Sequence, residues 1–211
     1  MANTNKPTGL APVRYLSGAD WDGKGNWYYI DSTDTNAYSQ GDVVALAAGL
    51  DGVSGLPTIT LGTAGNTCVG AILAIGASPS STTSLRGGPI IDASDLTKIS
   101  APATKTKNYF ALVADDPMIV FEIQEIGTGT QLTKTATTRN ANFVYAAPAT
   151  GVAYSGTMLD NASINTTSTL NLKLLGLVQR YDNGAYNAFG AYAKWLCLLN
   201  NHYYRLGTAG V

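Results

Sequence analysis

The chain has 211 residues, and its 13 Lys and Arg nearly balance its 14 Asp and Glu, which gives a formal net charge of −1. Charged residues make up only 13% of the sequence, against roughly 25% in an average soluble domain, so nucleic-acid binding through a broad basic face is disfavoured. The longest apolar stretches, such as residues 42–48 and 68–75, are much shorter than the ~20 residues of a membrane helix.

Short apolar runs separated by Gly, Pro, Asn and Asp occur along the whole chain, and none has the spacing of an amphipathic helix. The predicted strands, in chain order, are residues 27–31, 42–46, 58–61, 68–75, 109–114, 118–124, 143–146, 169–179 and 194–200. This pattern predicts an all-β fold, a jelly-roll or Greek-key β-barrel or sandwich. We expect a single barrel domain over residues 15–211.

Two of these strands carry the clearest patterns. In residues 118–124, Ile119 and its alternate neighbours should face a core, while Glu122 and its alternate neighbours should face outward. In residues 169–179, leucines alternate with polar residues up to Leu174, after which the alternation reverses. A β-bulge near Leu174 and Gly176 is expected to produce this reversal.

Two segments have no clear strand pattern. Residues 1–14 contain Pro7 and Pro12, which favour an extended chain, and we expect an N-terminal arm there. Residues 77–107 are rich in Ser, Thr, Pro and Gly and should form a long loop. The opening residues lack the basic and apolar blocks of a secretory signal, so we expect the protein to be made in a cytoplasm.

Few residues could carry chemistry. His202 is the only histidine, and no nucleophile or phosphate-loop motif accompanies it. Cys68 and Cys197 lie in apolar runs, where thiols act as small buried hydrophobes. Asp116 and Glu122 are the one plausible acid pair, with Asp115 and Glu125 beside them, but Asp115 and Asp116 more simply form a turn before Pro117. We therefore assign no catalytic, cofactor-binding or metal-binding residue.

Aromatic residues gather near both ends of the chain. Trp21, Trp27 and Tyr28 could form a stacking platform for a sugar, and Tyr203 and Tyr204 belong to a second group near the C-terminus. The alternative, which we favour, is that these side chains form core and subunit contacts. A surface poor in charge and rich in Tyr also suits burial against other protein, because interfaces are depleted in charge and enriched in aromatic residues.

The order of several segments resembles a known family. The chain reads GLAPVRYLSGADWDGKGNWYYI, then GDVVAL, VGAILAIG and VADDPMIVFEIQE, and closes with LLGLVQRYDNGAYNAFGAYAKWLCLLNNHYY. This order is similar to that of the capsid cement or decoration proteins of tailed phages, including short-tailed phages whose cement protein is a jelly-roll β-barrel. Residues 77–107 show no part of the resemblance.

The resemblance implies a non-enzymatic virion protein that binds the outer surface of the phage head and bridges neighbouring major capsid proteins. It also implies a homodimer or homotrimer, with no cofactor and no direct contact with nucleic acid or membrane. The expected interface residues are Pro7, Leu10, Pro12, Arg14, Trp21, Trp27, Tyr28, Tyr203 and Tyr204. The alternatives are a carbohydrate-recognition module of a phage fibre or host-attachment apparatus and, less favoured, an enzyme that uses Asp116 and Glu122.

Overall fold

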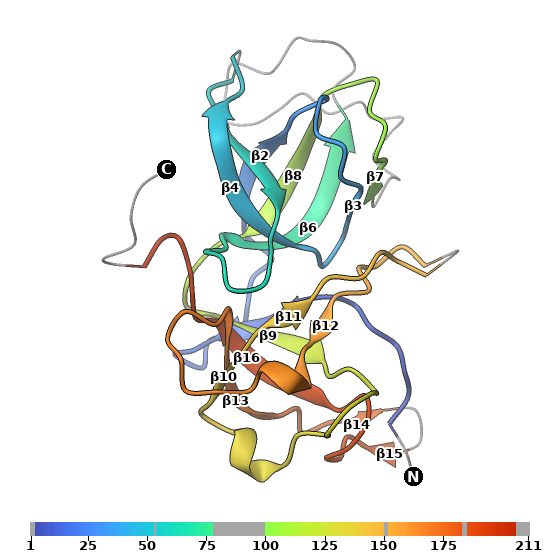
Figure 1. The fold of residues 1–211 in the computed structure, drawn as a ribbon. Coiled ribbons are helices and arrows are strands. Elements are labelled where there is room, and N and C mark those ends of the chain that lie inside the picture. The colour runs from blue at the N-terminus through green and yellow to red at the C-terminus, as the bar shows by residue number, and fades with distance from the viewer. Residues whose placement is uncertain (1–2, 53, 78–99, 150–151, 183–184, 206–211) are drawn as a thin grey trace.

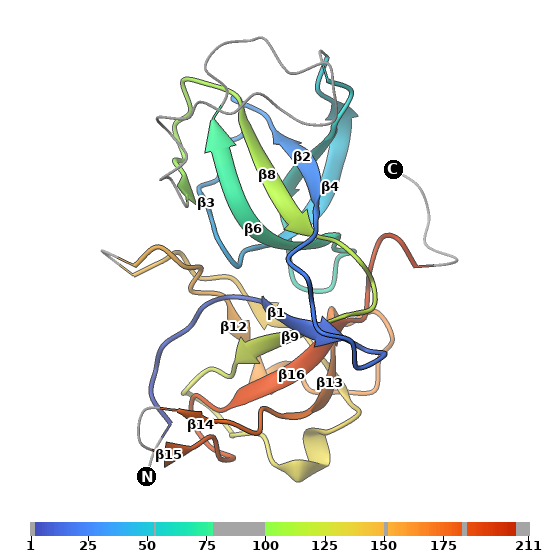
Figure 2. The ribbon, with the colours of Figure 1, turned by 180° about the vertical axis from the view of Figure 1, so that it is seen from behind.

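A computed structural model of the chain describes residues 3–52, 54–77, 100–149, 152–182 and 185–205. These residues form strands, loops and two short 3-10 turns, with no α-helix among them. The predicted all-β fold is confirmed. Figures 1 and 2 show two β units, one above the other, which we call the barrel and the lower unit.

The barrel is a closed sheet of five strands in the order β2-β5-β4-β6-β8. Its strands are β2 (Asn26–Ile30), β4 (Val43–Leu50), β5 (Pro57–Leu61), β6 (Gly70–Ala77) and β8 (Tyr109–Ala114). Four of the five pairings are antiparallel, and β2 closes the barrel on β5 in parallel, where Tyr29 lies opposite Thr58. Val44, Ile59 and Ala111 are buried in the barrel core, because alternate residues on each strand point inward.

The lower unit is built on an antiparallel sheet in the order β1-β9-β16-β13-β10. These strands are β1 (Ala11–Tyr15), β9 (Ile119–Gln124), β16 (Lys194–Leu199), β13 (Leu172–Leu177) and β10 (Asn140–Ala141). Phe121, Leu174 and Trp195 lie in its core. The same cluster includes Val43 and Ala114 from barrel strands, so apolar packing continues across the junction of the two units.

Smaller elements complete both units. Three two-stranded sheets pair β3 (Tyr38–Ser39) with β7 (Ser100–Ala101), β11 (Phe143–Val144) with β12 (Met158–Leu159), and β14 (Tyr181–Asp182) with β15 (Ala185–Tyr186). The 3-10 turns are η2 (Lys134–Ala136) and η3 (Asn161–Ser163). Side chains that cap turns, such as Asp160 at η3, fix these connections locally.

The chain crosses between the units in a way that differs from the predicted single barrel over residues 15–211. Strand β1 belongs to the lower unit, β2 to β8 build the upper barrel with its β3–β7 ribbon, and β9 to β16 return to the lower unit (Figures 1 and 2). The barrel is therefore an insertion between two neighbouring strands, β1 and β9, of one sheet. Alternating apolar residues define strands but do not show which strands share a core, so the sequence could not separate the two units.

The N-terminal segment also differs from the predicted arm. Leu10 is 1% exposed and lies in the core of the lower unit, and residues from Ala11 onward pair with β9. Before this strand, the backbone N–H of Lys6 donates to Gln124 Oε1 at 2.8 Å, and Asn3 Nδ2 donates to Ala188 O at 2.8 Å. The segment is thus extended but bound along its own chain. Most of the predicted loop over 77–107 lies outside the described residues.

Strand β9 corrects one further prediction. Its pattern predicted one outward face, but all six of its residues are buried. Glu122 is 7% exposed because the Arg180 guanidinium binds both carboxylate oxygens, at 2.9 and 3.0 Å, and Lys194 Nζ lies 3.5 Å from Oε1. The outer face of this strand is therefore covered by polar partners from the same chain.

Candidate functional site

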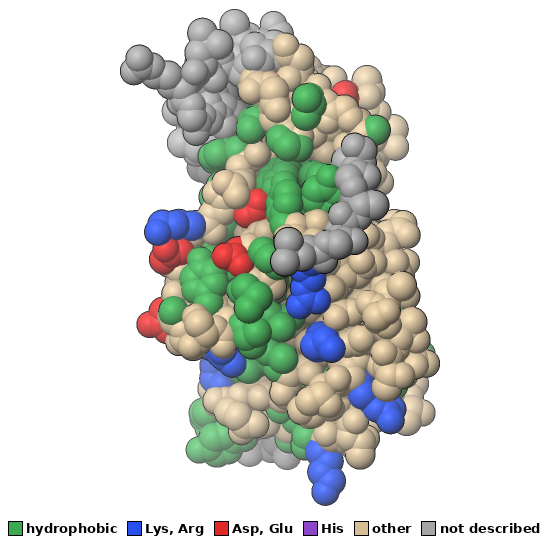
Figure 3. All heavy atoms as spheres, turned by 90° about the vertical axis from the view of Figure 1, so that its left-hand side faces the viewer, with side chains coloured by type: hydrophobic (Ala, Val, Ile, Leu, Met, Phe, Trp, Pro, Cys, Tyr) green, Lys and Arg blue, Asp and Glu red, His purple; other side chains and the backbone are tan. Residues whose placement is uncertain are grey.

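One face of the molecule exposes apolar side chains next to the junction of the two units. Val13, Leu16 and Met118 are each more than 40% exposed, and the Leu16 N–H donates to the Met118 carbonyl at 2.8 Å. Tyr204, also 46% exposed, completes the set that we call the junction face. Figure 3 shows hydrophobic side chains running down one side of the molecule, with acidic side chains among them and Lys and Arg side chains along the edges.

Hydrogen bonds hold Tyr204 in place although its ring is exposed. Its hydroxyl lies 2.8 Å from that of Tyr28, which donates to Asp115 Oδ2 at 2.6 Å. The backbone N–H of Tyr204 donates to His202 Nδ1 at 3.0 Å, and its ring packs edge-on against Tyr203 with centroids 5.2 Å apart. An exposed aromatic ring that is already ordered loses little side-chain entropy when a partner covers it.

The groups beneath Tyr204 form a buried polar cluster. Asp115 is 7% exposed and also accepts from Asn26 Nδ2 at 2.9 Å. Burial and the Asp115 hydrogen bond raise the pKa of Tyr28 far above its ordinary value, so the phenol stays protonated. Burial lowers the pKa of His202 to about 4, so the imidazole is neutral near pH 7. The cluster therefore supports the face without adding a net positive charge to it.

The expected interface residues do not form one exposed surface. Tyr28, Tyr203 and Tyr204 are brought together at the junction, but Tyr28 is 2% exposed and supports Tyr204 from below. The half-buried residues of this set are Pro7, Pro12, Arg14, Trp21, Trp27 and Tyr203. Leu10 is a core residue and is not available to a partner, because it packs under the lower sheet.

The sugar platform proposed for Trp21, Trp27 and Tyr28 does not form as expected. Tyr28 points into the barrel core, and its neighbour Trp27 points the opposite way because side chains alternate along β2. Trp21 packs against the core of the lower unit instead. These three rings therefore do not share one exposed stacking face.

The acidic residues have separate structural partners. Asp116 Oδ1 accepts from the Met118 N–H at 2.7 Å, as a turn-forming residue does, while Glu122 is bound by Arg180. Glu125, which is fully buried, accepts from Trp195 Nε1 at 2.9 Å and from the Leu132 N–H at 2.8 Å. Each carboxylate is thus engaged in holding a turn or the sheet.

Both cysteines are free and buried, as the sequence predicted. Burial raises the pKa of Cys68 to about 12 and also raises that of Cys197, so both remain thiols. Within the described ranges, no group of three or more His, Cys, Asp or Glu is placed to hold a metal ion. In the same part of the chain, no helix has the length and apolar character needed to cross a membrane.

A second set of exposed aromatic residues lies on the β14–β15 hairpin and just after it, and we call it the hairpin patch. Tyr181, Tyr186 and Phe189 are 59%, 74% and 48% exposed, and the two tyrosine rings meet edge-on with centroids 5.1 Å apart. Sequence patterns did not identify Val13, Leu16 and Met118 on the junction face.

Comparisons with protein-family models, with curated proteins and with solved structures found no match for this chain.

Proposed function

We propose that this protein is a non-enzymatic structural subunit of a tailed-phage virion. In this proposal it is made in the host bacterial cytoplasm, binds the outer surface of the head and bridges neighbouring major capsid proteins as a cement or decoration protein. The proposal rests on the resemblance in segment order and on the character of the junction face.

The junction face is the observation that carries the proposal. Leu16, Met118 and Tyr204 expose apolar surface from an ordered framework, and only 13% of the residues in the sequence are charged. The buried centres of protein interfaces combine apolar and aromatic side chains with few charges. We infer that Tyr204 and Met118 are the anchors that the capsid shell covers.

The hairpin patch supports the second part of the proposal, a homodimer or homotrimer. Tyr186 is 74% exposed and lies against Tyr181 on a short hairpin. A symmetric contact would bring the same patch of two copies together and cover both rings. Subunits linked in this way hold several weak shell contacts at once, so each contact can be modest.

The test is binding of the purified full chain to undecorated heads assembled from the phage major capsid protein. Bound protein is measured by co-sedimentation, and negative-stain images show whether it forms repeated density on the shell. Met118→Lys places a charge on the junction face and should reduce shell binding by at least about tenfold, because the ammonium would lose its hydration when the shell covers it.

Leu50→Lys is the matched control, since Leu50 is a 66% exposed aliphatic residue at the end of β4 in the barrel. This variant should bind shells as the unchanged protein does. Failure of the unchanged protein to bind the shells, or equal binding by the Met118→Lys variant, would remove the basis of the proposal.

A further inference from the structure

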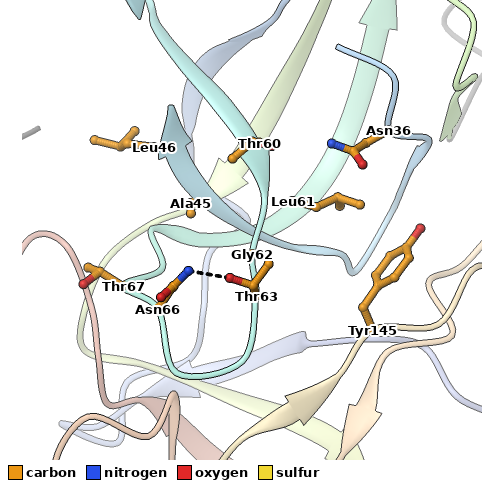
Figure 4. Close-up of a pocket in the computed structure, with 10 residues that line it drawn as sticks. All are labelled: Asn36, Ala45, Leu46, Thr60, Leu61, Gly62, Thr63, Asn66, Thr67 and Tyr145. Atoms are coloured by element: carbon orange, nitrogen blue, oxygen red, sulfur yellow. Dashed lines mark hydrogen bonds between the residues drawn. The ribbon is translucent and has the colours of Figure 1, made fainter. Parts of the chain in front are cut away.

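A groove of about 540 Å³ lies where the barrel meets a loop of the lower unit. Its lining includes Asn36, Thr60, Thr63, Asn66, Thr67 and Tyr145, with aliphatic side chains of β4 and β5 between them, and none of the lining residues that the structure describes is charged. Figure 4 shows Tyr145 rising from the lower unit toward Leu61 and Asn36. The volume falls within the roughly 300–1,000 Å³ of small-molecule sites.

The loop on one side of the groove is fixed by the lower unit. Asn171 Nδ2 donates to the Asn66 carbonyl at 2.6 Å, and Asn171 Oδ1 accepts from the Gly65 N–H at 2.7 Å. Within the loop, Asn66 Nδ2 donates to Thr63 Oγ1 at 2.6 Å. The amide and hydroxyl groups of this loop are therefore held in one arrangement before any ligand arrives.

The opposite side is fixed by a buried cation. The backbone N–H of Asn36 donates to Asp34 Oδ1 at 2.6 Å, and its carbonyl accepts from Lys105 Nζ at 2.7 Å. The Lys105 side chain is completely buried, and its ammonium also lies 5.2 Å from the centre of the Tyr38 ring. Because Lys105 is bound to these groups, it positions Asn36 but adds no charge to the groove surface.

The combination of groups in the groove matches an uncharged sugar. A sugar ring has an apolar C–H face, which stacks on an aromatic ring, and hydroxyl groups that both donate and accept hydrogen bonds. Tyr145 is 39% exposed and offers the ring, and the lining also contains the amide and hydroxyl groups of Asn36, Asn66 and Thr60. An anionic ligand would find no cation among the described residues of the lining and would have to lose its hydration without compensation from them.

We propose that this groove binds a short neutral oligosaccharide. The inference goes beyond the proposed capsid function, and it uses a different surface from the junction face and from the Trp21, Trp27 and Tyr28 platform. A subunit on the outside of a phage head would carry the groove as a separate contact site for cell-surface or environmental glycans.

The test is saturation-transfer NMR with the full-length protein and maltotriose, cellotriose or N,N′,N″-triacetylchitotriose at millimolar concentration. We expect at least one neutral trisaccharide to bind, and trigalacturonic acid, a carboxylated trisaccharide of the same length, to show no transfer. Tyr145→Ala should weaken the binding by about tenfold, whereas Tyr145→Phe should retain most of it because the ring remains.

Tyr154→Ala is the control, because Tyr154 is exposed to a similar extent, 45%, on the same connection between β11 and β12 but does not line the groove. Its affinity should match that of the unchanged protein. The inference is overturned if none of the three neutral sugars binds, if trigalacturonic acid binds as tightly as they do, or if Tyr145→Ala leaves the affinity unchanged. Shell binding is measured independently, so either proposal can fail alone.

Discussion

Two buried groups should give this protein opposite pH dependences of stability. His202 is 1% exposed, and burial lowers its pKa from 6.5 to about 4. The nearby Asp115 and Asp116 oppose this shift, while Arg205 adds to it. Between pH 4 and 6.5 the unfolded chain binds more protons than the folded one. The contribution of His202 to the free energy of unfolding is therefore fully present above pH 6.5 and is lost as the pH falls toward 4. The full interval corresponds to about 3 kcal/mol.

Asp42 should give the free energy of unfolding the opposite pH dependence. It is fully buried, its Oδ2 accepts from the Ser39 N–H at 2.7 Å, and burial raises its pKa from 3.8 to about 6. Between pH 3.8 and about 6 the folded chain therefore binds more protons than the unfolded one. The contribution of Asp42 to the free energy of unfolding is fully present below pH 3.8 and is lost as the pH rises through about 6. This interval also corresponds to about 3 kcal/mol, so the two effects nearly cancel between pH 4 and 6.

Single substitutions should reveal the cancellation. In His202→Asn, the amide oxygen can still accept from the Tyr204 N–H. Between about pH 4.5 and pH 7, the free energy of unfolding of this variant should fall by about 2 kcal/mol relative to that of the unchanged protein. In Asp42→Asn, it should rise by about 2 kcal/mol over the same range. Comparing each variant with itself at two pH values removes the constant effect of the altered packing.

Urea unfolding followed by tryptophan fluorescence measures these free energies. Because His202 is the only histidine, its ring signal in NMR also reports its pKa directly. A normal imidazole titration near 6.5, or equal pH slopes for both variants and the unchanged protein, would show that these groups are not buried in their neutral forms.

Three further outcomes follow from the contacts described above. Glu125→Ala removes the acceptor of the Trp195 indole and the Leu132 amide and should lower the free energy of unfolding by about 3 kcal/mol, measured in urea; a loss below about 1 kcal/mol would contradict the buried network. Deleting residues 1–14 removes Leu10 and most of β1 and should lower the thermal midpoint strongly, whereas deleting residues 1–5 should lower it only slightly; equal midpoints would show that the strand adds nothing. Tyr186→Lys should convert the oligomer to a monomer in light scattering, and an unchanged mass would separate the hairpin patch from self-association.

The strands themselves were largely predictable from local pattern. The predicted strand 109–114 has the same bounds as β8, and the predicted bulge lies where the β13–β16 register shifts, between Leu174 and Gly176. Strand β1 was missed because Pro12 reads as a strand breaker, although proline is tolerated on an edge strand such as this one. Turn residues and alternating apolar residues are local signals. They were sufficient to predict each strand that pairs with a neighbouring strand on both sides.

The candidate surfaces were less predictable, because exposure depends on contacts between distant segments. Glu122 reads as an outward residue, yet Arg180 and Lys194 cover it from positions far along the chain. Leu10 reads as part of a free arm but fills a core formed by later strands. The groove at Tyr145 had no signal in the sequence, since its walls come from two units that alternation could not distinguish.

The junction between the two units is the feature that ties the proposals together. After β16 the chain returns to the barrel, where the Cys68 N–H donates to the Asn201 carbonyl at 2.9 Å and the Tyr203 N–H donates to the Cys68 carbonyl at 2.8 Å. With the contact between the Tyr28 and Tyr204 hydroxyls and the Asn171 contacts, these bonds fix the barrel against the lower unit. A subunit that bridges capsomers needs a rigid connection between its two contact surfaces. If the connection were a flexible hinge, the second surface would meet its binding site less often once the first surface had bound. The same fixed junction holds Tyr145 opposite the loop of the groove, so loosening it should weaken sugar binding and shell binding together, although the two sites do not overlap.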